Sequence, residues 1–353
     1  MQDQRTGATI RQVTGHPSIH HQPFFFIPAY DRDMNWLFFV SHRTGAPQIF
    51  VEELAGGRLV QLTDRPGLGE WSVYPARQGG KVLFVRDSSA WSLDLADFQE
   101  TELAHFGEGS TKEEGMVGPA MGTTALSYDD RWWAVPVKQK DRFCLYIIDV
   151  QSAKHTVVLE DEKIGHPQFC PDDDHLILYL ATMADPVWLL DRESGQKRRV
   201  YLRDGANRQW ITHAAWIPGR REVSLVDWPN GMLAVQIDSG SIRQITRFNA
   251  WHAIASPDGK QMVADTHLPD IGLQIFDPLD GTGAPKPLCH PDASQIGEHW
   301  GMPFPYDRGP IKVYAPQHTH PHPSFSPDLS RVVFTSDRSG HSQVYECYLP
   351  ARA

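Results

Sequence analysis

The chain has 353 residues, of which 41% are hydrophobic, and its formal net charge at pH 7 is −10. An acidic chain is a poor partner for nucleic acid, because phosphate binding needs a basic surface. No segment approaches the run of about 18 apolar residues that identifies a membrane span, so no membrane partner is expected either. The first residues lack the apolar core of a secretory signal, and the four cysteines form no CxxC pair. We therefore expect a cytoplasmic protein with reduced thiols.

A strand-and-turn unit of about fifty residues recurs along the chain. In its first copy, the β-rich run Trp36–Val40 leads through a Thr44-Gly45 turn to a second run, Gln48–Val51. In the last copy, a Ser-Pro-Asp turn at 326–328 precedes the run 331–337. We expect seven such units, approximately at 24–64, 71–104, 122–160, 164–202, 211–247, 249–289 and 319–350.

Repeated units of four short strands are typical of a β-propeller, in which each unit is one blade. The last unit stops after its third strand at Leu349-Pro350, whereas Ile10–Thr14 repeats the pattern of the outer strands but lies before the first unit. Residues 8–14 are therefore expected to complete the last blade, which removes an open sheet edge. The sequence predicts an all-β, seven-bladed β-propeller, one domain over 1–353, closed by its N-terminal strand. Two insertions, 105–121 and 290–318, are expected at the mouth where the inner strands begin.

Histidines recur just before the predicted inner strands. The inner strands of a propeller line its central channel, so these positions should meet at one mouth. Five of the seven units carry a histidine there, namely His21, His166, His213, His252, and the pair His320 and His322. Each of them alone could be an ordinary histidine bonded to the backbone near a turn, and His166, which precedes a proline, has the strongest case for that role.

Gln317, His320 and His322 lie within six residues, and with His252 they predict a four-ligand metal site with open positions. Neutral imidazoles and an amide oxygen bind Mn, Fe, Co, Ni or Zn without cancelling the charge of the ion. Such a site suits an anionic group such as a carboxylate. Another histidine of the ring could then move a proton.

The segment Gln317–Phe325 resembles the Gln-x-x-His-Pro-His-Pro-Ser-Phe element of oligogalacturonate lyases, which are seven-bladed propeller enzymes of pectin breakdown. The resemblance implies that Gln317, His320, His322 and His252 hold a manganese ion. It also implies that His213, in the segment 210–216, is a catalytic base or acid. The implied reaction is a β-elimination on small acidic oligosaccharides, in which loss of the C5 proton of a uronate gives a 4,5-unsaturated product.

The chain departs from this family on blade four, where Pro186 stands at the place of a catalytic arginine. Substitutes could come from loops, and the candidate substrate-binding residues are His21, His166, Arg208, His299 and Arg308. The arginines could equally be surface residues, and the aromatic residues of the 290–318 insertion could simply pack on the propeller. Two other functions therefore stay open: a metal-dependent propeller enzyme of other carbohydrate specificity, and a TolB-like propeller that binds proteins without catalysis.

Overall fold

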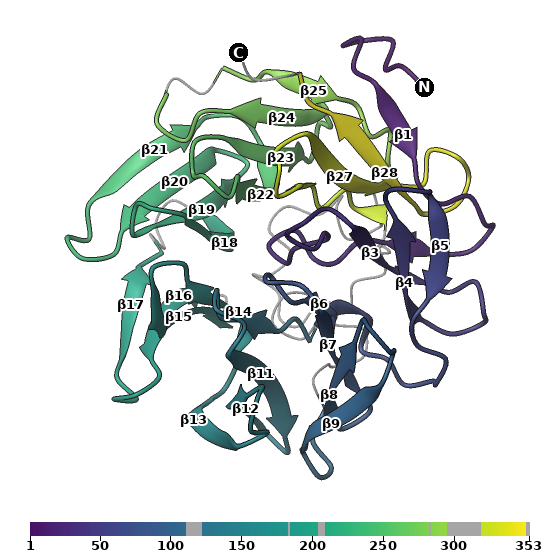
Figure 1. Cartoon of the computed structure of the whole chain (residues 1–353). Coiled ribbons are helices and arrows are strands. Elements are labelled where there is room, and N and C mark those ends of the chain that lie inside the picture. The colour runs from purple at the N-terminus through teal and green to yellow at the C-terminus, as the bar shows by residue number, and fades with distance from the viewer. Residues whose placement is uncertain (111–121, 183, 204–208, 282–283, 295–318, 351–353) are drawn as a thin grey trace.

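Seven four-stranded antiparallel sheets surround a central channel in the computed structural model (Figure 1). The structure describes residues 1–110, 122–182, 184–203, 209–281, 284–294 and 319–350. The sheets follow one another around the ring in chain order, so the fold is the predicted seven-bladed β-propeller. The described residues form no α-helix, and among them a short 3-10 helix, η1 (Glu70–Ser72), precedes the second blade. No helix in this part of the chain has the length and apolar character needed to cross a membrane.

In each of the first six blades the strands run from the channel outward in chain order. Blade one consists of β2 (His20–His21), β3 (Trp36–Ser41), β4 (Gln48–Glu53) and β5 (Arg58–Gln61). Blade two consists of β6 (Tyr74–Pro75), β7 (Lys81–Arg86), β8 (Ser89–Asp94) and β9 (Glu100–His105). Blade three consists of β10 (Ala125–Leu126), β11 (Trp132–Gln139), β12 (Arg142–Asp149) and β13 (His155–Asp161). Blade four consists of β14 (Gly165–Cys170), β15 (Asp173–Thr182), β16 (Asp185–Asp191) and β17 (Lys197–Tyr201). Blade five consists of β18 (Trp210–Ile217), β19 (Glu222–Trp228), β20 (Gly231–Gln236) and β21 (Ile242–Thr246). Blade six consists of β22 (Ala250–Ala255), β23 (Met262–Thr266), β24 (Leu273–Phe276) and β25 (Pro287–Cys289). Blade seven consists of β26 (Ser324–Phe325), β27 (Arg331–Ser336), β28 (Gln343–Tyr348) and, outermost, β1 (Ile10–Gln12).

The inner strands are rich in β-branched and aromatic residues because each blade packs between two neighbours and is buried on both faces. In β7, every residue after Lys81 is buried. Val82 and Phe84 of this strand share one core cluster with Phe38 and Val40 of the preceding blade. Clusters of this kind between adjacent blades hold the ring together.

The ring is closed by the N-terminal strand, as predicted. β1 pairs antiparallel with β28, so that Ile10 lies opposite Cys347. Arg11 of β1 adds two ion pairs across the junction, from Nη1 to Oε1 of Glu52 and from Nη2 to Oε2 of Glu346, each 2.6 Å long. The closure therefore rests on both a strand ladder and a partly buried charge network.

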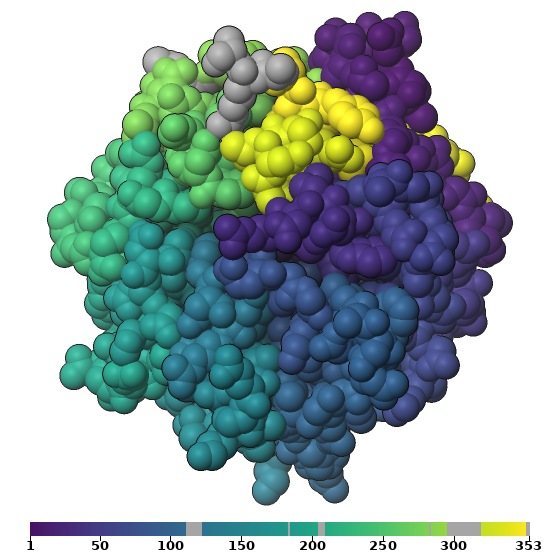
Figure 2. Space-filling view, in the orientation of Figure 1, coloured from purple at the N-terminus to yellow at the C-terminus, as the bar shows by residue number. Residues whose placement is uncertain are grey.

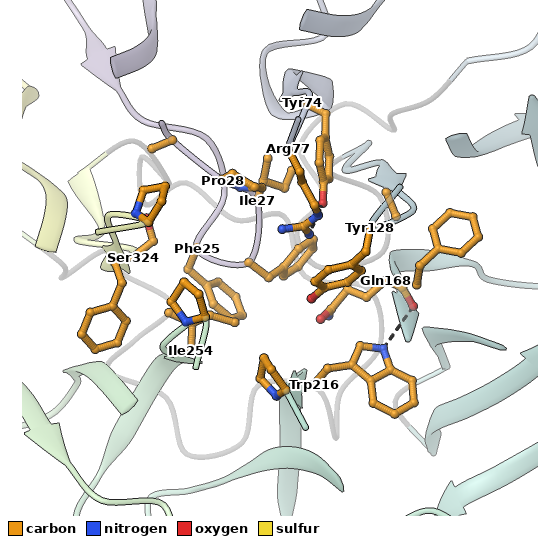
Figure 3. Close-up of a pocket in the computed structure, with 18 of the residues that line it drawn as sticks. Phe25, Ile27, Pro28, Tyr74, Arg77, Tyr128, Gln168, Trp216, Ile254 and Ser324 are labelled. Atoms are coloured by element: carbon orange, nitrogen blue, oxygen red, sulfur yellow. Dashed lines mark hydrogen bonds between the residues drawn. The ribbon is translucent and has the colours of Figure 1, made fainter. Parts of the chain in front are cut away.

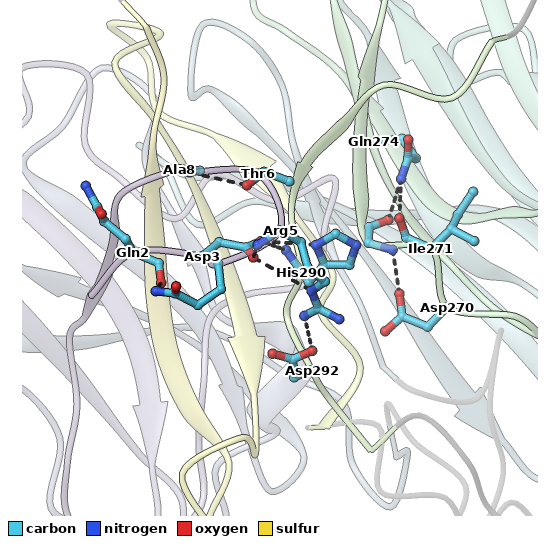
Figure 4. Close-up of polar contacts among 12 residues, drawn as sticks. Gln2, Asp3, Arg5, Thr6, Ala8, Asp270, Ile271, Gln274, His290 and Asp292 are labelled. Carbon is cyan, nitrogen blue, oxygen red and sulfur yellow. Dashed lines mark hydrogen bonds and ion pairs between the residues drawn. The ribbon is translucent and has the colours of Figure 1, made fainter.

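The residues that precede β1 are held against the loop after β25 (Figure 4). The carboxylate of Asp3 accepts hydrogen bonds from the backbone N–H of His290 at 2.5 Å and from its Nδ1 at 3.1 Å, and Arg5 forms an ion pair with Asp292. Burial raises the pKa of the Asp3 carboxyl, but hydrogen bonds from Arg5 and His290 outweigh this and lower the pKa to about 2. These contacts tie the start of the chain to blade six.

A loop formed by residues 22–28 interrupts the inner strand of blade one and enters the channel. His21 still pairs with β3, and pairing resumes where the N–H of Phe38 donates to the carbonyl of Ala29 at 2.7 Å, so the backbone between them leaves the sheet. Phe24 and Phe25 on this loop are 1% exposed. The purple N-terminal part of the chain accordingly reaches the middle of the ring in Figures 1 and 2. The loop is a plug on which the channel histidines pack.

Candidate metal centre

Three of the predicted metal ligands come together at one mouth of the channel. His252 lies on β22, and His320 and His322 immediately precede β26 in the next blade. One ring nitrogen of each lies within 4.8 Å of the other two, and the three side chains are at most 1% exposed. The ring of His252 is centred 4.0 Å from that of His322 and 5.6 Å from that of His320. Three buried imidazoles this close together are a suitable donor set for a transition-metal ion.

A β-bulge aims the channel histidine in each of blades four, five and six. At the histidine, two residues of the inner strand lie opposite one residue of the next strand, with register shifts between Gly165 and Gln168, Thr212 and Ala215, and Ala250 and Ala253. His166, His213 and His322 also have left-handed backbone conformations, with φ of 49°, 45° and 45°. Bulges of this kind redirect a side chain, and non-glycine residues with positive φ concentrate at functional sites.

Asp265 holds two of the candidate ligands in place, and the bulge of β22 puts it directly beside His252. Its Oδ2 lies 2.8 Å from Nδ1 of His252, and its Oδ1 accepts the backbone N–H of His252 at 2.6 Å. The same Oδ2 accepts the backbone N–H of His322 at 3.3 Å. A carboxylate on Nδ1 fixes the ring so that Nε2 is left for a metal, which is the usual support of a metal-binding histidine.

Burial keeps the imidazoles of His252 and His322 neutral at physiological pH. Burial lowers the pKa of His252 and of His322 well below the ordinary value, and the charges of the neighbouring histidines lower both further. Burial raises the pKa of the Asp265 carboxyl well above its ordinary value, against the hydrogen bonds from His252 and His322. Neutral imidazoles have the lone pairs that a metal needs. Nε2 of His322 is buried and has no hydrogen-bond partner among the described residues, which fits a site built for an ion.

His213 lies beside the cluster, and its hydrogen bonding leaves Nε2 unprotonated, as a general base requires. Its ring is centred 4.3 Å from that of His252. Nδ1 donates to the carbonyl oxygen of Trp251 at 2.7 Å, so Nε2 of the neutral ring carries the lone pair. Burial lowers the pKa of His213 to about 3, against the hydrogen bond to Trp251. The ring is therefore an unprotonated acceptor at neutral pH, next to the candidate metal ligands.

His166 and His21 line the same mouth but do not join this cluster. His166 stacks on Phe24 with the ring centroids 4.9 Å apart, and its Nδ1 lies 3.0 Å from the hydroxyl of Thr123. Burial lowers its pKa to about 3. This packing favours the structural role over contact with a substrate. His21 is separated from His322 by Trp71, which lies 4.3 Å from the first ring and 5.6 Å from the second.

Four predicted site residues, Gln317, Arg208, His299 and Arg308, lie outside the described residues, as do the insertion segments 111–121 and 295–318. They remain predictions. Pro186, which the sequence comparison predicts to stand at the place of the family's arginine, is a buried residue of β16.

A cavity of about 330 Å³ lies at the other end of the inner strands (Figure 3). It is lined by Phe25, Phe26 and Ile27 of the plug and by the turns that contain Pro257 and Pro327. None of the channel histidines lines it. The plug thus separates this cavity from the candidate metal centre, and the metal-binding chemistry lies at the opposite mouth.

The fold and these histidines define a β-propeller protein with a candidate metal centre at one mouth of its channel. A sequence profile described as oligogalacturonate lyase matches residues 1–353. The chain belongs to the oligogalacturonate lyase family, which confirms the resemblance seen in the segment Gln317–Phe325.

Individual relatives agree with this assignment over nearly the whole chain. The oligogalacturonate lyase of Dickeya dadantii is 23% identical, over 99% of this chain and 95% of its own length. The oligogalacturonide lyase of Pectobacterium atrosepticum is 21% identical over the same shares of the two chains. A solved structure of an oligogalacturonate lyase in complex with manganese matches with a TM-score of 0.82 at 22% identity, over 99% of this chain and 95% of that chain. An oligogalacturonate lyase from Vibrio parahaemolyticus matches with a TM-score of 0.81 at 19% identity, over 99% and 96%.

Proposed function

We propose that the protein is a manganese-dependent lyase that cleaves small oligogalacturonates by β-elimination. The observation that carries the proposal is the meeting of His252, His320 and His322 beside His213, whose Nε2 is available as a base. Membership of the family gives the reaction and the substrate class, and one relative has been solved with manganese.

The three imidazoles would hold the ion, and Gln317 is the proposed fourth ligand. Bound there, a divalent ion supplies positive charge that polarises the carboxylate of a uronate and acidifies the neighbouring C–H bond. Asp265 keeps Nε2 of His252 free of its proton by accepting the N–H of Nδ1. Because the imidazoles of the cluster are neutral, they do not cancel the charge of the ion, and an anionic substrate would be attracted to it.

His213 is the proposed base. Its Nε2 takes the proton from C5 of the uronate, and the electron pair of that C–H bond forms the double bond between C4 and C5. The bond from C4 to the glycosidic oxygen breaks, and that oxygen leaves with the electron pair and takes a proton from solvent. The ring packs edge-to-face against Phe25 and Trp251, with centroids 5.8 and 4.7 Å away, which fixes its position beside the cluster.

The test is an assay of the purified protein with manganese and a mixture of short oligogalacturonates. We expect ultraviolet absorbance from the conjugated 4,5-unsaturated product, and its loss together with the bound metal in the double variant H320A/H322A. Absence of product from any uronate oligosaccharide, with manganese shown to be bound, would overturn the proposal.

A second candidate is a metal-dependent enzyme with a different uronate substrate. The specific observation in its favour is Pro186, which leaves β16 without the arginine of the family. The two candidates give different results when oligogalacturonates and other uronate oligosaccharides are compared under the same conditions.

We place this activity in the cytoplasm. All four cysteines are free and buried, which suits a reducing compartment.

A further inference from the structure

A second set of metal-ligand side chains meets at the junction of blades one and two. His21 ends β2, His42 follows β3, and Glu70 begins η1. Nε2 of His21 lies 3.3 Å from Oε2 of Glu70, and Nε2 of His42 lies 2.8 Å from the same oxygen. One ligand atom of each residue lies within 4.8 Å of the other two.

The hydrogen bonds of His21 require a cation at its Nε2. Nδ1 lies 3.0 Å from the carbonyl oxygen of Gln22, which can only accept, so Nδ1 must carry a proton. Nε2 faces the carboxylate of Glu70. The carboxylate of Glu70 is an acceptor too, and the same oxygen lies 2.8 Å from Nε2 of His42. A neutral imidazole has a single N–H, so either a second proton or a metal ion must lie between Nε2 and Glu70.

The geometry fits a metal ion. In a tetrahedral site with bonds of about 2.0–2.1 Å, the ligand atoms are about 3.3 Å apart. The contact between His21 and Glu70 has this length. The contact of His42 with Glu70 is shorter, at 2.8 Å, and a bound ion would have to lengthen it; the side chain of His42 is 25% exposed. The bond from Nδ1 of His21 to a backbone carbonyl is the outer support expected of a metal-binding histidine.

We propose that His21, His42 and Glu70 form a second metal site that takes a divalent transition ion, with zinc the best match. Two imidazoles and one carboxylate are the protein ligands of an open zinc site, which keeps at least one position for a further ligand. The partial exposure of His42 and Glu70 gives the ion a path from solvent.

The position of this site suggests what its open coordination position binds. Trp71 contacts a histidine of each site, with its ring centred 4.3 Å from that of His21 and 5.6 Å from that of His322. Two ions bound near one tryptophan would engage two anionic groups of a single ligand. An acidic oligosaccharide carries a carboxylate on each uronate, so the second ion binds the carboxylate of a neighbouring sugar. This role rests on the proposed function, whereas the metal site itself does not.

The experiment counts zinc ions on metal-stripped protein after dialysis against zinc, by elemental analysis. We expect two ions per chain in the wild type, one in each of the variants E70Q and H42Q, and one in H320A/H322A. The variant E102Q is the matched control, because Glu102 lies 3.9 Å from His105 without a second histidine, and it should keep two ions. If circular dichroism shows that E70Q does not fold, the zinc count of H42Q tests the second site instead, since the side chain of His42 is partly exposed and its replacement should be tolerated.

A wild type with fewer than two ions, or two ions retained in folded E70Q and H42Q, overturns the second site. For its role, E70Q should raise KM for oligogalacturonates at least about fivefold with little change in kcat, the pattern of lost substrate binding. If E70Q loses one zinc ion but keeps the KM of the wild type, the role in substrate binding is overturned, whereas the second metal site is supported. If the wild type cleaves no uronate oligosaccharide, the proposed function fails, but the zinc count still decides the site.

Discussion

Nδ1 of His252 lies 2.8 Å from Oδ2 of Asp265, and the two side chains are 1% and 0% exposed. The contact exists because the bulge between Ala250 and Ala253 turns His252 toward the strand that carries Asp265. The proposed ligand nitrogen, Nε2 on the other side of the ring, would thus be controlled by Asp265, a residue outside the proposed ligand set.

Changing Asp265 to Asn should lower the affinity for manganese about 10- to 100-fold. The amide N–H₂ can donate to Nδ1 of His252, which moves the ring proton to Nε2 and blocks the metal-binding lone pair. Titration calorimetry with Mn²⁺ on folded protein measures the effect. D270N is the control, because Asp270 is an exposed carboxylate on the same blade that bonds to Gly272 and Thr266 instead. Equal affinities of D265N and the wild type would show that Asp265 has no part in metal binding.

The fold was predictable because each repeat consists of short, strongly β-forming runs. The closure was predictable because Ile10–Thr14 has the pattern of an outer strand but precedes the first unit, whereas the last unit lacks its outer strand. The meeting of His252, His320 and His322 followed from their shared place in that repeat. Asp265 was not predictable, because it lies on the next strand and becomes a neighbour of His252 only through the bulge.

The plug and the second histidine cluster escaped sequence reasoning for a related reason. The run Phe24–Phe26 looks like part of an inner strand, and its exit from the sheet depends on the space inside the closed ring. His42 lies in the first unit and Glu70 between the first and second units. Nothing in the sequence spacing predicts that His21 and His42 contact the same oxygen of Glu70. The signal that could have found the plug is the Phe-Phe-Phe-Ile-Pro sequence at 24–28, in which proline ends strand pairing.

The variant H213N should lose about 10²- to 10⁴-fold in kcat while it keeps its manganese. Asparagine is chosen because it tolerates the left-handed backbone of this position, with φ of 45°. The measurement is a steady-state assay with elemental analysis of the same samples. H166N is the comparison, since His166 has the same left-handed conformation but is more deeply buried and bonds to Thr123. A larger loss in H166N than in H213N would mean that the base has been assigned to the wrong histidine.

Removal of the Arg11 side chain should destabilise the closed ring by about 3–5 kcal/mol, because it leaves the buried carboxylates of Glu52 and Glu346 short of a partner. Urea unfolding followed by tryptophan fluorescence measures the difference between R11A and the wild type. R58A is the matched control. Arg58 pairs with Glu53 on the surface, with its side chain 68% exposed, so its loss should leave the free energy of unfolding almost unchanged. Similar losses in both variants would mean that the junction network adds nothing beyond the β1–β28 ladder.

His20 should make the stability of the metal-free protein depend on pH. Burial lowers its pKa from 6.5 to about 4, partly offset by a hydrogen bond with His16. The unfolded chain therefore takes up a proton as the pH falls below about 6.5, whereas the folded chain resists until about 4. The stabilisation is complete above pH 6.5 and is lost as the pH falls to 4, at up to about 1.4 kcal/mol per pH unit from this residue.

The variant H20F removes this titration and also a buried Nδ1 that lacks a hydrogen-bond partner among the described residues. The ring still packs near Phe39, whose centroid lies 6.1 Å from that of His20. We expect H20F to match the wild type at pH 8 and to lose less free energy of unfolding between pH 7 and 5, in urea titrations with chelator present. H155Q is the control, and it should keep the slope of the wild type because His155 is exposed in the folded chain. If H20F and the wild type lose the same free energy of unfolding between pH 7 and 5, groups other than His20 take up the protons.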